Sequence, residues 1–193
     1  MKKWWRKLNS MYWNIKTVLY HGTVSEIDKI DVSLGRDRKD FGKGFYIAVT
    51  KAQAVGMMHK KYKETVRRSR NKNTGNFKEN LYEIKINREA LSNLKIKVFD
   101  DADLEWLDFV LMCREQGGVP HDYDLVVGPT ADDDTAFCLK AYSEGLYGKI
   151  GSVEAKEILL KNLETENLGV QYFIGKQEIA DQVIESINKI DWR

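Results

Sequence analysis

Cysteine, histidine and proline are scarce in this chain, which has two, three and two of them among its 193 residues. The two cysteines and three histidines offer no spacing typical of a zinc site. Cys113 and Cys138 each fall within a stretch of helical pattern, and so little cysteine favours a reducing, cytosolic compartment. Two prolines argue against a long disordered linker. We therefore expect one folded domain that binds no metal.

Long apolar runs are also absent. The segment Met1–Lys7 is basic and aromatic, but it is not followed by the apolar run of roughly 7 to 15 residues that a signal peptide requires. No other segment could span a bilayer, which predicts a cytoplasmic protein without membrane insertion. Export as an effector would need a route other than the standard signal.

Charge of one sign is not in excess. The 31 basic and 29 acidic residues leave a net charge of +2, so no global field draws the protein onto nucleic acid or a membrane. Residues 1–16 are an exception, because they carry lysines, an arginine and tryptophans but no acid. They either form a short helix whose tryptophans dock on the domain, or they contact a partner or nucleic acid. We treat 1–16 as a basic aromatic extension and 17–193 as the domain.

The rest of the composition, 42% hydrophobic and 11% aromatic, is enough for a full core. Apolar and alternating patterns predict strands at 17–21, 44–49, 80–87, 94–99, 123–127 and 169–175. Helical periodicity and capping residues predict helices at 51–68, at 104–116 after Asp103, from about 132, after Ser152, and at 177–190. Because the helices are unequal and several strands alternate, the fold class is α+β instead of a doubly wound parallel sheet.

The helix predicted at 51–68 becomes strongly basic towards its end, from Lys60 to Arg68, and leads into a polar loop at 71–76 that we expect to be mobile. Two explanations are open for these cations. They form either a solvated helix face or a phosphate-binding patch.

Two segments of the sequence predict a cleft. Val18–Thr23 is an apolar strand ending in His21 and Gly22, and Asp40–Ala48 is a glycine-punctuated turn that leads into a strand. Gly42 and Gly44 permit positive φ and let a ligand approach the backbone, while a histidine supplies one donor and one acceptor. This combination suits a nucleotide better than a metal. The turn is neither a Walker loop nor a dinucleotide fingerprint, because the spacing fails and a strand follows it.

These motifs resemble the signature strands of ADP-ribosyltransferases. The resemblance rests on His21-Gly22-Thr23, on the run from Phe41 to Ala48, and on Gln171-Tyr172-Phe173-Ile174. It is to the branch of diphtheria toxin and the poly(ADP-ribose) polymerases, and the chain is more similar still to an uncharacterised bacterial domain family within that superfamily, which also shares the run from Val126 to Asp133. The resemblance implies a split antiparallel β-sheet core with flanking helices.

What the resemblance implies about the site is a pocket for NAD, used as a co-substrate without a metal. His21 would hold a ribose hydroxyl, the Gly22 backbone would pair with the carboxamide, and Tyr46 would stack on the nicotinamide ring. Lys43 would face solvent. The resemblance adds further NAD contacts at Thr23, Arg36, Asp40, Gly44 and Phe45.

The third member of the family triad is a glutamate, and the matching position here is Gln171. Three explanations are open: Gln171 suffices for an acceptor that is already a good nucleophile, a neighbouring acid completes the site, or the domain binds NAD or ADP-ribose without reacting. The candidate acids are Glu164, Glu166 and Asp132–Asp134; the last three could also simply begin a helix at the positive end of its dipole.

The implied function is mono-ADP-ribosylation of toxin or toxin-antitoxin type, with a protein or nucleic acid as acceptor and an antitoxin as a further partner. One alternative is a non-catalytic NAD- or nucleotide-binding module. Another is NAD-dependent removal of a 2′-phosphate from RNA, which predicts anion contacts from Arg36, Arg38 and Lys39.

Overall fold

The computed structural model describes residues 15–69, 77–131, 133–163 and 168–193, with the side chains of 133–136 left aside. The helix expected within 1–16, apart from its last two residues, and the polar loop at 71–76 lie outside the described residues.

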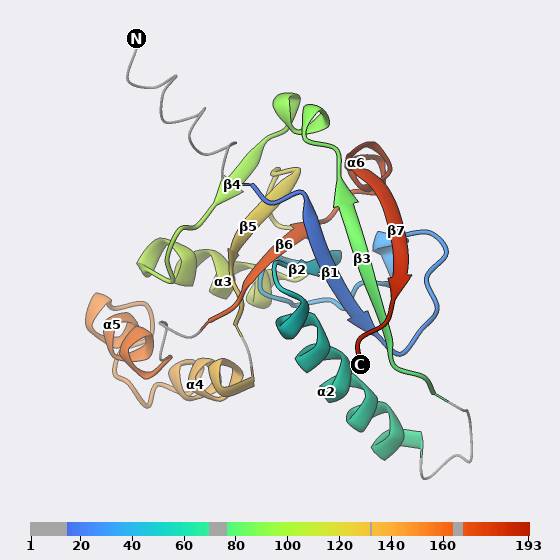
Figure 1. Ribbon diagram of the computed structural model, residues 1–193. Helices are drawn as coiled ribbons and strands as arrows, with labels where there is room; N and C mark the ends of the chain where they lie inside the picture. The colour runs from blue at the N-terminus through green and yellow to red at the C-terminus, as the bar shows by residue number, and fades with distance from the viewer. Residues whose placement is uncertain (1–14, 70–76, 132, 164–167) are drawn as a thin grey trace.

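One sheet of seven strands organises the described part of the chain (Figure 1). Its order is β4-β5-β6-β2-β1-β3-β7, and every pairing is antiparallel except that of β4 with β5. The strands are β1 (Val18–Thr23), β2 (Phe45–Ala48), β3 (Asn80–Ile86), β4 (Ile96–Val98), β5 (Leu125–Pro129), β6 (Val170–Ile174) and β7 (Ile184–Ile190). This confirms the α+β class.

Helices cover the sheet and connect its strands. They are α2 (Lys51–Ser69), α3 (Leu104–Gln116), α4 (Asp133–Ser143), α5 (Val153–Asn162) and α6 (Gln177–Val183), with short 3-10 turns η1 (Val32–Leu34) and η2 (Glu89–Asn93). The expected caps are present: the Asp103 carboxylate accepts from the Trp106 N–H at 2.9 Å, and the Ser152 hydroxyl accepts from the Ala155 N–H at 3.2 Å. In the described part of the chain, no helix is long and apolar enough to cross a membrane.

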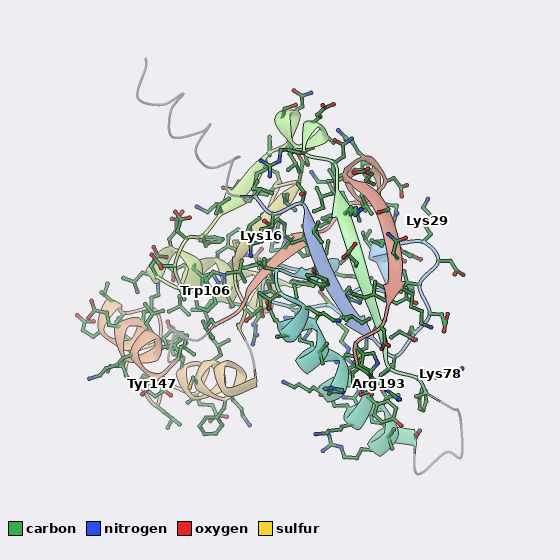
Figure 2. The ribbon with its side chains drawn as sticks, viewed as in Figure 1. Lys16, Lys29, Lys78, Trp106, Tyr147 and Arg193 are labelled. Atoms are coloured by element: carbon green, nitrogen blue, oxygen red, sulfur yellow. The ribbon has the colours of Figure 1, made fainter. Side chains whose placement is uncertain are left out.

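The core lies on both faces of the sheet, because alternate strand residues point to opposite sides. On β6, Tyr172 and Ile174 join a cluster that α6 closes through Val183, whereas Phe173 joins a second cluster. That second cluster packs under α3 and α5 around Trp106, which is fully buried (Figure 2). A third, smaller cluster packs α2 on β1 and β3, with Ala54 and Met58 from the helix, Tyr20 from β1 and Leu81 from β3.

The predicted helix at 177–190 is wrong in its second half. α6 stops at Val183, and β7 pairs with β3 at the edge of the sheet. The isoleucines at 184, 187 and 190 repeat at a helical interval, but β-branched residues also favour strands, and the ladder along β3 decides between the two. Consequently β6 is not the last strand of the fold.

Candidate functional site

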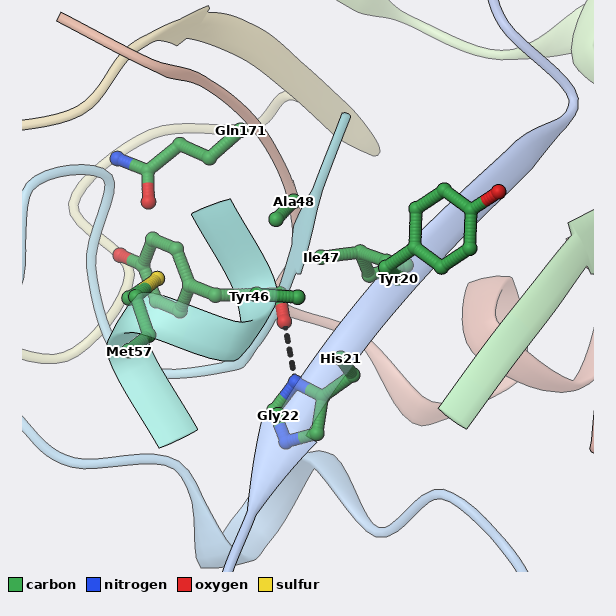
Figure 3. Close-up of a pocket in the computed structure, with 9 residues that line it drawn as sticks. Tyr20, His21, Gly22, Tyr46, Ile47, Ala48, Met57 and Gln171 are labelled. Atoms are coloured by element: carbon green, nitrogen blue, oxygen red, sulfur yellow. Dashed lines mark hydrogen bonds between the residues drawn. The ribbon is translucent and has the colours of Figure 1, made fainter. Parts of the chain in front are cut away.

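The candidate site lies where β1 and β2 separate. Their paired register consists of Tyr20 opposite Ala48. Beyond it, the ring of His21 lies between the strands, and its Nδ1 lies 2.8 Å from the Tyr46 carbonyl oxygen (Figure 3). Because a carbonyl can only accept, Nδ1 carries the proton, so Nε2 of the neutral ring is an acceptor.

Burial lowers the pKa of His21 from 6.5 to about 4, while its bond to Tyr46 opposes the shift and the charge of Lys61 adds to it. The imidazole is therefore neutral at pH 7, with the tautomer that the Tyr46 carbonyl selects. The ring packs against Phe45, with 4.6 Å between the ring centroids. His21 thus has the donor and acceptor predicted for it, with the donor already used.

Acid is expected to destabilise the fold through His21. Between pH 6.5 and about 4, the unfolded chain binds a proton that the folded protein does not, so stability is greatest above pH 6.5 and falls as the pH drops towards 4. The half-buried ring limits the loss to at most about 3 kcal/mol. Urea unfolding of the wild type and of His21→Gln at pH 7 and pH 4.5 measures it. An equal loss in both proteins would assign the effect to other groups.

Tyr46 contributes its ring, because its hydroxyl is already bonded. The hydroxyl donates to the Gly42 carbonyl at 2.7 Å and accepts from the Phe41 N–H at 2.9 Å. Burial raises the pKa of this phenol, and the charge of Asp40 adds to the rise, so the group stays neutral. Figure 3 shows the ring close to Met57 and Gln171. An aromatic surface is thereby fixed at the wall of the site.

The glycines of the turn make room for the protein's own backbone. Gly42 has φ 104°, as predicted, but Gly44 does not have positive φ. A Cβ at Gly44 would lie 2.4 Å from the Ile174 carbonyl oxygen, and one at Gly42 would lie 2.7 Å from that of Gly118. The space that a side chain at Gly44 would need is therefore taken by β6, although Gly44 itself also lines the cleft described below. Lys43 is exposed, as expected.

The carboxylate of Asp40 is bonded to other groups of the protein. The residue is 6% exposed, and Arg114 binds its Oδ1 at 2.6 Å. Its Oδ2 accepts from the Ala131 N–H at 2.9 Å and from Gln171 Nε2 at 2.8 Å. The direct NAD contact predicted for Asp40 is not supported, because both carboxylate oxygens are already bonded. The sequence could not reveal these partners, which lie 74, 91 and 131 positions away.

A cleft of about 670 Å³ brings the candidates together. It is lined by His21, Thr23, Arg36, Asp40, Gly44, Phe45, Tyr46 and Gln171. A smaller pocket of about 50 Å³ adjoins it and contains His21, Gly22, Tyr46 and Gln171. Within this lining, the Thr23 hydroxyl is engaged by the Ser25 N–H at 3.2 Å. The acids Asp132, Glu164 and Glu166 lie outside the described residues, as do the side chains of Asp133 and Asp134.

Cations from two distant segments face this cleft. Arg36 and Lys39 come from the loop before β2, and Lys60 and Lys61 come from α2. Loss of hydration lowers the pKa of both Lys39 and Lys61, and neighbouring cations, Arg36 among them, add to both shifts. Glu64 offsets part of the charge, 3.9 Å from Arg36.

Arg38 does not line the cleft with Arg36 and Lys39. Its φ is 55°, and its guanidinium donates to the carbonyls of Arg114 and Glu115 at the end of α3. The sequence grouped Arg38 with Arg36 and Lys39 by proximity alone, and its anion contact is not supported. The sequence places the lysines of α2 in a separate basic segment, but Lys60 and Lys61 line the cleft.

One further residue was missed by the sequence. Gln53 on α2 lines the cleft and packs against Gly169, and both its amide atoms are buried without a partner among the described residues. Buried amides are normally hydrogen-bonded, so this one is a candidate for a ligand contact. No signal in the sequence distinguishes Gln53 from an ordinary surface glutamine of a helix.

The fold and the cleft together define an α+β protein with a concave site lined by residues of β1, β2 and β6. Residues 17–184 match a family described as protein of unknown function (DUF3990), and the chain belongs to that family. Comparisons with curated proteins and with solved structures gave no match. Among the described residues, no group of three or more histidine, cysteine or acidic side chains could hold a metal ion.

Proposed function

We propose that this protein is an NAD-dependent mono-ADP-ribosyltransferase that acts on a macromolecule. One observation carries the proposal: an imidazole acceptor, a fixed phenol ring and a buried amide, from β1, β2 and β6, meet at one cleft. The cleft volume lies within the range of roughly 300 to 1,000 Å³ that is usual for small-molecule sites. A split antiparallel sheet of the ADP-ribosyltransferase kind belongs to the same proposal.

Each group has a role that its geometry permits. His21 Nε2 accepts a ribose hydroxyl, the face of Tyr46 stacks on nicotinamide, and the Gln171 carbonyl accepts a second hydroxyl. The bond between C1 of the ribose and nicotinamide breaks, and its electron pair leaves with the nicotinamide nitrogen. The acceptor nucleophile then bonds to C1 and loses a proton to water. As in glycosidases, the sugar passes through an oxocarbenium-like state.

The cations of the cleft support a phosphorylated substrate. Arg36, Lys39 and Lys61 face a space that also contains the candidate ribose contacts. A dinucleotide carries a diphosphate between its two riboses, and cationic side chains bind phosphate oxygens with charge-assisted hydrogen bonds. In this proposal the three cations hold the diphosphate.

Transfer of labelled ADP-ribose from NAD to proteins and nucleic acids of a lysate tests the proposal. We expect label with the wild type and a drop on the order of 10²-fold for His21→Ala, Tyr46→Ala and Gln171→Ala, because each removes a preorganised contact. Tyr46→Phe is the matched control, since it keeps the ring. Label that survives all three alanine substitutions would refute this site.

A non-catalytic NAD-binding module is the second candidate, and the neutral Gln171 favours it, because a positive sugar is stabilised by a nearby negative charge. Calorimetry with NAD, together with a long incubation for released nicotinamide, separates the two. NAD that binds without releasing nicotinamide, with lysate present, supports the module and contradicts the transferase. With either candidate function, an antitoxin partner would be a protein that binds over the cleft.

A further inference from the structure

The hydrogen bond between Asp40 and Gln171 gives the glutamine amide a single orientation. The two residues are 6% and 4% exposed, and Gln171 Nε2 lies 2.8 Å from Asp40 Oδ2. An ionised carboxylate only accepts hydrogen bonds, so the amide nitrogen must face it. The carbonyl oxygen therefore points the other way, towards Tyr46, as Figure 3 shows.

The Asp40 carboxylate is surrounded by hydrogen-bond donors. Arg114 donates to Oδ1 through Nη2 at 2.6 Å and through Nε at 3.2 Å, and the Ala131 N–H donates to Oδ2 at 2.9 Å. A carboxylate has about four lone-pair sites, and these bonds with that of Gln171 use them. Asp40 is thus a fixed negative charge that lines the cleft but has no lone pair left for a ligand.

We propose that Asp40 is a positioning residue that makes Gln171 act in place of a carboxylate, an inference that rests on the proposed transferase activity. Asp40 fixes the Gln171 carbonyl towards the ribose and polarises it through the amide. The negative charge that stabilises the oxocarbenium-like sugar then lies one side chain away from the reacting centre. No proton moves between the two groups in this role.

Moving the charge from residue 40 to residue 171 tests this role. We expect Asp40→Asn to lower kcat for nicotinamide release on the order of 10²-fold while the Kd of NAD stays within about threefold. In Asp40→Asn/Gln171→Glu, the amide introduced at position 40 can donate to the carboxylate introduced at position 171. We expect the activity of this double variant to be at least about tenfold above that of Asp40→Asn alone.

The single variant Gln171→Glu gives a readout that a structural role would not change. It places two carboxylates side by side, so one pKa rises. Its pH-rate profile should show an ionisation at higher pH than any in the wild type or in the double variant, because only this variant has two adjacent carboxylates. This test stands even if Asp40→Asn does not fold.

Asp37→Asn is the matched control for a loosened loop. Asp37 is exposed and accepts from the Gly118 N–H at 2.6 Å, but it does not touch Gln171. The kcat of Asp37→Asn should equal that of the wild type. A double variant no faster than Asp40→Asn, or a Gln171→Glu profile identical to that of the wild type, overturns the positioning role. A wild type that releases no nicotinamide overturns the proposed function itself, and with it this role.

Discussion

Replacing Gly22 by alanine is expected to destabilise the protein by about 3 kcal/mol or more, a large part of the roughly 5 to 15 kcal/mol by which ordinary domains are stable. A Cβ at this position would lie 2.1 Å from the Ala54 carbonyl oxygen and 2.7 Å from Met58 Cβ. The first of these atoms is helix backbone, so α2 would have to move off β1. Because α2 carries Met57 and Lys61, the cleft would open with it. Thermal unfolding followed by circular dichroism measures the loss.

Gly56→Ala is the matched control, because Gly56 is on α2, the helix that Gly22 contacts. A Cβ at Gly56 meets nothing within 4 Å, and alanine is a better helix former than glycine by about 0.8 to 1 kcal/mol. The control should therefore raise the unfolding temperature. Equal stability of Gly22→Ala and the wild type would contradict the close contact of α2 with β1.

The local part of the site could be predicted from the sequence. The apolar strand ending in His21 and the aromatic strand containing Tyr46 are both short segments with strong β-propensity, and they form β1 and β2. Their side chains needed no long-range information to be identified as candidates. The hydrogen bonds of their polar atoms could not be predicted in this way, because the Tyr46 carbonyl that accepts the hydrogen bond from His21 belongs to another strand.

Residues whose role depends on tertiary contacts were predicted less well. Asp40 reads as a ligand contact in a glycine-rich turn, but its partners Arg114 and Gln171 come from α3 and β6. The sequence leaves Lys61 either on a solvated helix face or in a phosphate-binding patch, and only the packing of α2 places it at the cleft with Arg36. Neither the contacts of Asp40 nor the position of Lys61 beside Arg36 can be recognised from the spacing of residues in the sequence.

The C-terminal segment shows the same limit for secondary structure. Its isoleucine spacing fits a helix, and only the ladder with β3 turns Ile184–Ile190 into a strand. Propensity alone could not decide, since isoleucine is compatible with both states.

Reversing two charges of the cleft is expected to weaken NAD binding by about 10³-fold. In the proposed complex with NAD, Lys39→Glu/Lys61→Glu removes two charge-assisted contacts to the diphosphate, each worth about 1.5 to 3 kcal/mol, and adds repulsion. The wild-type Kd should also rise with salt, because the cations are partly exposed to solvent. Calorimetry with NAD at two salt concentrations measures both effects, and nicotinamide alone, which has no phosphate, should bind both proteins equally.

Lys63→Glu/Lys85→Glu is the matched control, with the same change in net charge. Both lysines are exposed and neither lines the cleft, although Lys63 is on the same helix as Lys61. If the two double variants bind NAD equally, the cleft lysines do not hold the diphosphate. If Lys39→Glu/Lys61→Glu instead loses binding to single-stranded RNA while its Kd for NAD is unchanged, the same cations serve a nucleic-acid substrate, and the RNA-directed alternative replaces the diphosphate contact.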